Sequence, residues 1–133
     1  MTNPIRIHYM EDDISLANLV KRKLQRQGYV VDLSGDGIEC LAKVTESHYD
    51  ILILDYITPN LTGLEVLQKL AETNYLLPSI MVSGSDDIKV VIEAMKLGCI
   101  DYVVKEVGDY FSLLTVSINN VLEKIQLKTA KEQ

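Results

Sequence analysis

The chain has 133 residues, of which 47% are hydrophobic, and this size and apolar content suit one domain with one buried core. The formal net charge of −6 argues against direct binding of nucleic acid, because contact with a phosphate backbone needs clustered lysine and arginine. No run of 18 or more apolar residues exists, and charge appears before any stretch that could serve as a signal peptide, so we expect a cytoplasmic protein without membrane contact. Cys40 and Cys99 lack the close spacing of a metal site or redox pair and are expected to be buried.

Short β-prone runs alternate with segments of helical period along the chain. The predicted strands are residues 5–10, 29–33, 50–54, 79–82 and 100–104. The apolar stripes that predict helices are Leu16, Leu19, Val20 and Leu24; Ile38, Leu41 and Ala42; Leu64, Leu67, Leu70 and Ala71; Val90, Val91, Ala94 and Met95; and Leu114, Ile118, Val121 and Ile125.

This alternation, with continuously apolar strands, indicates a parallel sheet covered by helices on both faces. The expected fold class is α/β: a single doubly wound five-stranded parallel sheet in the order 2-1-3-4-5 with five helices. Gly28, Gly35, Gly37 and Gly98 fall at predicted element ends, and Pro78 precedes the fourth strand. The domain is expected to span residues 1–126, and the polar residues 127–133 form a tail that is either a frayed helix end or a linker stub.

Candidate site residues follow four of the five predicted strands, and the second strand ends in Leu33 and Ser34 at the sheet edge. The candidate residues are Glu11, Asp12 and Asp13 after the first strand, Asp55 after the third, Ser83 after the fourth and Lys105 after the fifth. Ligands of a doubly wound sheet bind at the carboxyl ends of its strands, so these residues should meet in one pocket. Asp13 is the exception, because an acidic residue directly before a helix is expected to cap it.

Carboxylates held this close together repel one another. At a separation of about 4 Å and an effective dielectric near 20, two like charges cost about 4 kcal/mol, which favours either a shared proton or a bound cation. Oxygen ligands of this kind suit Mg²⁺. With such an ion present, Asp55 would stay ionised and could attack a phosphoryl group, Lys105 would bind a phosphoryl oxygen, and the hydroxyl of Ser83 could turn toward it.

Four motifs carry a family resemblance: "YMEDD", "ILILDYITPNLTGLEVL", "IMVSGSDD" and "GCIDYVVK". Over residues 4–126 the chain resembles the receiver domain of response regulators in bacterial two-component signalling, whose fold is flavodoxin-like. The resemblance implies that Asp55 accepts a phosphoryl group, with Mg²⁺, from the phosphohistidine of a sensor histidine kinase or from a phosphotransfer protein. The domain would then relay the phosphorylation as a conformational signal. It implies no enzyme activity beyond the domain's own phosphorylation and dephosphorylation.

The resemblance also assigns roles to single residues. Glu11, Asp12, Asp55 and the backbone carbonyl of Ile57 would hold the metal, Glu11 through water; Ser83 and Tyr102 would form the switch pair; Lys105 would bind phosphate; Pro59 and Gly63 match the loop into the third helix. The face made by the fourth helix, fifth strand and fifth helix would contact an effector or a second copy of the chain. Lys89, Glu93 and Lys96 fall on or near that face.

The sequence departs from the family pattern beside the site. Glu106 follows Lys105 where the family usually has proline, and we expect a trans bond between them, with Gly108 in the loop and Asp109 capping the fifth helix. Thr58 stands where methionine is common. The apolar bulk of Ile57 is expected to hinder an attacking water and prolong the phosphorylated state.

Three other functions fit the sequence less well. A phosphatase of the haloacid-dehalogenase type needs a second aspartate two residues after the nucleophile, where Ile57 stands. A flavodoxin-like FMN carrier needs a phosphate loop rich in serine, threonine and glycine after the first strand, and this loop is acidic. A pseudo-receiver adaptor is disfavoured by the complete set of charged residues. His8 and His48 lie away from the strand ends and are expected to have packing roles.

Overall fold

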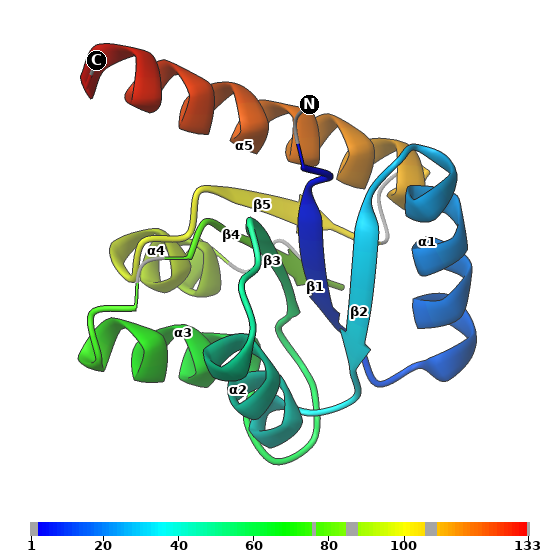
Figure 1. Cartoon of the computed structure of the whole chain (residues 1–133). Coiled ribbons are helices and arrows are strands. Elements are labelled where there is room, and N and C mark those ends of the chain that lie inside the picture. Colours follow the sequence, from blue (N-terminus) through cyan, green and yellow to red (C-terminus); the bar gives the residue numbers. More distant parts are fainter. Residues whose placement is uncertain (1–2, 76, 85–87, 106–108, 133) are drawn as a thin grey trace.

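The computed structural model describes residues 3–75, 77–84, 88–105 and 109–132. Five parallel strands form one sheet in the order β2-β1-β3-β4-β5, as predicted (Figure 1). The strands are β1 Arg6–Met10, β2 Val30–Ser34, β3 Ile51–Asp55, β4 Ser79–Ser83 and β5 Asp101–Val104. The helices are α1 Ile14–Arg26, α2 Gly37–Glu46, α3 Gly63–Glu72, α4 Ile88–Lys96 and α5 Tyr110–Glu132. Each predicted strand is confirmed to within one residue at either end.

The helices cover the two faces of the sheet and make two separate cores (Figure 1). Helices α1 and α5 pack on one face around Ile7, Tyr9 and Ile53, and we call this core the α1/α5 core. Helices α2, α3 and α4 pack on the other face around Met10, Leu52, Leu54 and Met81, which are strand residues that point to that side. Neighbouring residues of a strand point to opposite faces, so the apolar strands supply both cores at once.

Side chains at the helix starts satisfy backbone amides that have no partner inside the helix. Asp13 accepts a hydrogen bond from the amide of Leu16, which confirms its predicted role as the α1 cap. Asp109 accepts from the amides of Phe111 and Ser112 at the start of α5, so the second predicted cap is also confirmed. The predicted trans bond between residues 105 and 106, together with Gly108, lies outside the described residues.

The predicted apolar stripes differ in accuracy. The last is confirmed: Leu114, Ile118 and Val121 are buried and Ile125 is half-buried. In the other four, the side chains that proved exposed are Leu19, Ile38, Ala42, Ala71 and Met95. Helix α2 shows the reason: a Cβ on Gly37 would lie 2.4 Å from the Cβ of Leu61, so this close contact fixes the rotation of the helix and turns Ile38 outward.

Glycine ends two helices where the chain must turn back. Gly28 after α1 has φ +95° and Gly98 after α4 has φ +98°, a region that other residues adopt only with strain. At the other end of the chain, α5 continues to Glu132 and so includes residues 127–132 of the predicted tail. Among the described residues, no helix combines the length and the apolar character needed to cross a membrane.

Candidate functional site

The charged residues of the site lie on the same side of the sheet as the α1/α5 core. Alternate residues of a strand face the same side, and Glu11, Asp55 and Lys105 each come two residues after a member of that core. Those core members are Tyr9, Ile53 and Val103. Strands β1, β3, β4 and β5 run parallel with their carboxyl ends at one edge of the sheet. The topology therefore brings together side chains that lie 94 residues apart in the sequence.

Lys105 joins the two buried carboxylates of the site. Its Nζ lies 2.9 Å from Oδ2 of Asp55 and forms an ion pair with Oε1 of Glu11. The Glu11 side chain is 1% exposed and the Asp55 side chain 9%, whereas the Lys105 side chain is 20% exposed. A charge that is buried this deeply needs a partner of opposite sign, and Lys105 supplies that charge to both acids.

Asp12 completes a cluster of three acids. One ligand oxygen from each of Glu11, Asp12 and Asp55 lies within 4.8 Å of the others, and Asp12 is exposed. At that separation each pair of ionised carboxylates repels by about 3 kcal/mol at an effective dielectric near 20. Three carboxylates and one lysine sum to a charge of −2, which a divalent cation would balance. Carboxylate oxygens are also the ligands that Mg²⁺ prefers, so the residues fit that ion.

The pKa values reflect this arrangement. Burial raises the pKa of Glu11, the neighbouring Asp55 raises it further, and the hydrogen bond from Lys105 opposes them without reversing the shift. Burial by itself would lower the pKa of Lys105, but the hydrogen bonds to Glu11 and Asp55 outweigh it and raise the pKa above its usual value. Lys105 is therefore held as a cation at the site.

The other predicted site residues surround this centre. Ser83 is buried at the end of β4, and Tyr102 on β5 is half-buried against the core on the opposite face from Lys105. Ile57 is 73% exposed in the loop after β3. Thr58 is buried, and its hydroxyl donates to the carbonyl of Leu61, 2.7 Å away. The prediction that Ile57 prolongs the phosphorylated state stays a prediction.

Gly63 fixes the approach of α3 to the end of β3. A Cβ at this position would lie 2.7 Å from the carbonyl oxygen of Asp55 and 2.9 Å from Sδ of Met81. The amide of Gly63 donates to the carbonyl of Tyr56 at 2.9 Å, and Thr62 caps the helix with Glu65 in a reciprocal capping box. The close contact holds the loop after Asp55 against its own strand.

Sequence reasoning missed a second polar group beside the site. The hydroxyl of Tyr9 donates to Oε1 of Glu11 at 3.3 Å and lies 2.9 Å from the hydroxyl of Tyr110. Nζ of Lys105 lies 5.9 Å from the ring centroid of Tyr110. The available signal was a tyrosine two residues before an acid in a strand that should be aliphatic, but the contact with Tyr110 spans 101 residues.

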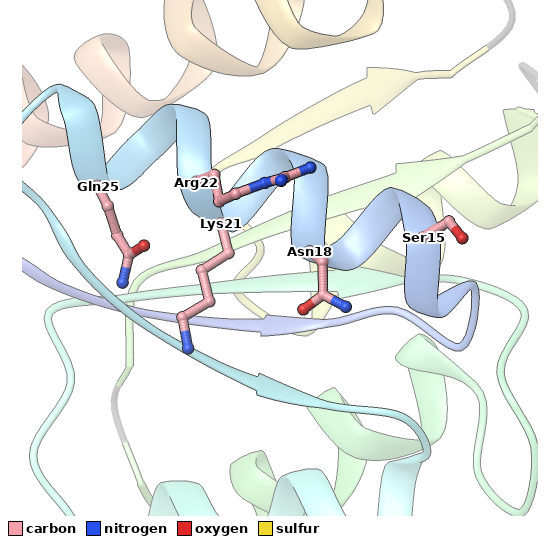
Figure 2. Close-up of a pocket in the computed structure, with 5 residues that line it drawn as sticks. All are labelled: Ser15, Asn18, Lys21, Arg22 and Gln25. Carbon is pink, nitrogen blue, oxygen red and sulfur yellow. The ribbon is translucent and has the colours of Figure 1, made fainter.

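Two surface hollows lie away from the acidic cluster. One, of about 540 Å³, runs along the outer side of α1 and is lined by Ser15, Asn18, Lys21, Arg22 and Gln25 (Figure 2). Another, of about 410 Å³, lies beside β2 and α2 and is lined by Asp32, Lys43 and Tyr49 among others. Figure 2 shows the α1 side chains spread along one helix rather than converging on a point, so we assign them no chemistry.

Comparison with known proteins agrees with the geometry. The family model of the response regulator receiver domain matches residues 7–115. The chain belongs to this receiver family. It is 32% identical to the transcriptional regulatory protein TrcR of Mycobacterium tuberculosis over 103 residues, covering 77% of this chain and 40% of TrcR. It is 34% identical to the response regulator MprA of Mycobacterium leprae over 101 residues, covering 76% of this chain and 44% of MprA. The matched residues thus span less than half the length of these relatives.

Solved receiver domains share its fold. The receiver domain of Francisella response regulator 1452 is 28% identical with a TM-score of 0.83, covering 92% of this chain and 99% of that one. The response regulator TrrA of Thermotoga maritima, solved in complex with Mg²⁺-BeF, is 26% identical with a TM-score of 0.77, covering 88% of this chain and 98% of that one. The predicted family and fold class are confirmed, and the family match replaces the phosphatase and flavin-carrier alternatives.

Proposed function

We propose that this receiver domain accepts a phosphoryl group on Asp55 from the phosphohistidine of a sensor histidine kinase or phosphotransfer protein. The observation that supports the proposal is the joining of Asp55 Oδ2 to Lys105 Nζ, at 2.9 Å, within the acidic cluster of Glu11, Asp12 and Asp55. Family membership points the same way. We propose no enzymatic role beyond the domain's own phosphorylation and dephosphorylation.

The step needs a free carboxylate and a way to offset phosphoryl charge. An oxygen of Asp55 would form the new bond to phosphorus as the P–N bond breaks and the imidazole leaves with its electron pair. Mg²⁺ held by Asp12, Asp55 and the backbone carbonyl of Ile57, and by Glu11 through water, would neutralise charge on the phosphoryl oxygens. Lys105 already touches Asp55, so a short movement away from Glu11 would bring its ammonium to a phosphoryl oxygen.

The signal would leave through Ser83 and Tyr102. We infer that Ser83 turns toward the phosphoryl group and that Tyr102 moves inward, which remodels the face of α4, β5 and α5. Apolar side chains are exposed on α4 at Ile88, Ile92 and Met95, and on α5 at Leu113 and Val116. Lys89, Glu93 and Lys96 are exposed on the same α4 helix. This surface is proposed to contact an effector or a second copy of the chain.

Phosphorylation can be tested by intact mass after incubation with a small acyl phosphate and Mg²⁺. We expect the unaltered protein to gain one phosphoryl group and Asp55→Asn to gain none, because the amide is not a nucleophile for phosphorus. Asp36→Asn is the matched control: it makes the same change at the α2 cap, where asparagine caps as well as aspartate, and should be labelled like the unaltered protein. Equal labelling of Asp55→Asn would refute the assignment.

A further inference from the structure

Glu11 is held by more donors than Lys105 alone. Its Oε1 accepts from the hydroxyl of Tyr9 at 3.3 Å as well as from Lys105, and its Oε2 accepts from the backbone amide of Asp13 at 3.2 Å. Tyr9 belongs to β1 and Asp13 precedes α1, so both of these donors are fixed by the fold. Only the Lys105 ammonium, on a flexible four-carbon side chain, can leave easily.

The contacts among Tyr110, Tyr9 and Glu11 indicate which hydroxyl donates each hydrogen bond. A tyrosine hydroxyl has one proton to donate. The proton of Tyr9 points to Glu11, which has no proton to give as a carboxylate. Either oxygen of the 2.9 Å contact between the two tyrosines could be the donor, and with the Tyr9 proton given to Glu11 the donor is Tyr110. The result is a chain of donors from Tyr110 through Tyr9 to Glu11.

Packing alone does not account for Tyr9. The residue is fully buried in the α1/α5 core, where its neighbours along the sheet, Ile7, Ile51 and Ile53, are all aliphatic. A hydroxyl in such a core destabilises the fold unless it is hydrogen-bonded, and Tyr9 meets this need through Glu11 and Tyr110. An aliphatic side chain at this position of β1 would pack in the core and need no hydrogen-bond partner. The presence of a hydroxyl therefore indicates a role at Glu11.

This chain of donors matters most when a phosphoryl group occupies the site. On the proposed function, Lys105 must turn from Glu11 toward a phosphoryl oxygen, and Glu11 then loses its ion pair. We propose that Tyr9 and Tyr110 are positioning residues for the metal site: their hydroxyls keep the Glu11 carboxylate in its binding orientation and connect it to the first residue of α5. Tyr110 also presents its ring to the Lys105 ammonium, so the start of α5 contacts both partners of that ion pair.

The test is the dissociation constant for Mg²⁺, measured by isothermal titration calorimetry on the full chain. Removing a partner that orients a metal ligand typically lowers metal affinity 10–100-fold, so Tyr9→Phe should weaken Mg²⁺ binding by about 10-fold or more. Tyr110→Phe should weaken it less, because Tyr9 still reaches Glu11. The double variant should match Tyr9→Phe alone, because Tyr110 acts only through Tyr9.

Tyr75→Phe is the matched control. It also removes a tyrosine hydroxyl that donates a hydrogen bond, here to the carbonyl of Val44 at 2.8 Å, and it should bind Mg²⁺ like the unaltered protein. If Tyr9→Phe and Tyr110→Phe both bind Mg²⁺ as Tyr75→Phe does, the positioning role is wrong. If the two losses multiply in the double variant, the donor chain is wrong. Failure of the unaltered protein to bind Mg²⁺ would instead overturn the metal site of the proposed function.

Discussion

At the scale of single residues, the histidine of β1 is the clearest case of a titratable group kept neutral by the core. His8 is fully buried, its Nε2 lies 2.8 Å from the hydroxyl of Ser34, and its ring packs edge-on against Tyr49 at 5.0 Å. Burial lowers its pKa to about 4, with the positive charge of Lys43 acting in the same direction and Asp32 against it. This agrees with the packing role expected for His8.

The lowered pKa predicts a pH-dependent stability. An unfolded chain takes up a proton on His8 near pH 6.5 and the folded chain only near pH 4, so the stabilisation is complete above pH 6.5 and is lost as the pH falls toward 4. Between pH 7 and pH 5 the loss should be about 2 kcal/mol in the free energy of unfolding. Urea denaturation across this range should show the slope in the unaltered protein and lose most of it in His8→Gln.

The exposed histidine gives the control for this measurement. The side chain of His48 is 77% exposed, so His48→Gln should keep the slope of the unaltered protein. The same slope in His8→Gln would show that other groups cause it.

At the scale of elements, one glycine determines how α3 meets β3. Gly63 leaves no room for a Cβ between the carbonyl oxygen of Asp55 and the sulfur of Met81. The helix start is otherwise well capped by Thr62 and Glu65, so the cap fixes where α3 begins and the glycine fixes how close it comes. The position of Asp55 therefore depends on the loop behind it.

Gly63→Ala tests this dependence. The added methyl group must push the strand end or Met81 aside, at a cost of about 1–3 kcal/mol in the free energy of unfolding, and it should also weaken Mg²⁺ binding by displacing Asp55. Gly35→Ala is the control, because a Cβ there meets nothing within 4 Å, and it should be neutral or stabilise by up to about 1 kcal/mol. Urea denaturation and Mg²⁺ titration check both variants, and an unaffected Gly63→Ala would contradict the account.

At the scale of the whole molecule, the sheet separates two cores that meet at the site. Lys105 lies on the side of the sheet that faces the α1/α5 core. Ser83 and Tyr102 lie on the opposite side, which is covered by α4 among other helices, because alternate residues of a strand face the same side. We therefore propose that a change at Asp55 reaches α4 and β5 through Ser83 and Tyr102, and α5 through Tyr110. The exposed apolar side chains of α4 and α5 lie at the end of these routes.

Phosphorylation should consequently change the α4, β5 and α5 face more than α2. Amide chemical shifts recorded before and after treatment with an acyl phosphate and Mg²⁺ should move along residues 88–104 and at the start of α5. Asp55→Asn under the same treatment controls for Mg²⁺ alone. Shifts confined to the strand ends and α2 would contradict the proposed route of the signal.

The sequence by itself determined the strand order, the strand limits and the residues that meet at the carboxyl edge. These features depend on local composition and on rules for parallel sheets, which hold for any chain with this alternation of strands and helices. Asp13 and Asp109 were predictable for the same reason, since a cap acts within its own first turn. Family motifs added the expected roles of Asp55 and Lys105.

Only the tertiary structure decided the rest. The outward turn of Ile38 depends on a contact between Gly37 and Leu61, and the bond between Tyr9 and Tyr110 joins the first strand to the last helix. Neither leaves a periodic signal, because both arise where segments distant in sequence pack at van der Waals distance. The ion pair of Lys105 is of the same kind: the sequence predicts that these charges meet at one edge of the sheet, but only the folded structure shows that Lys105 contacts Glu11 as well as Asp55.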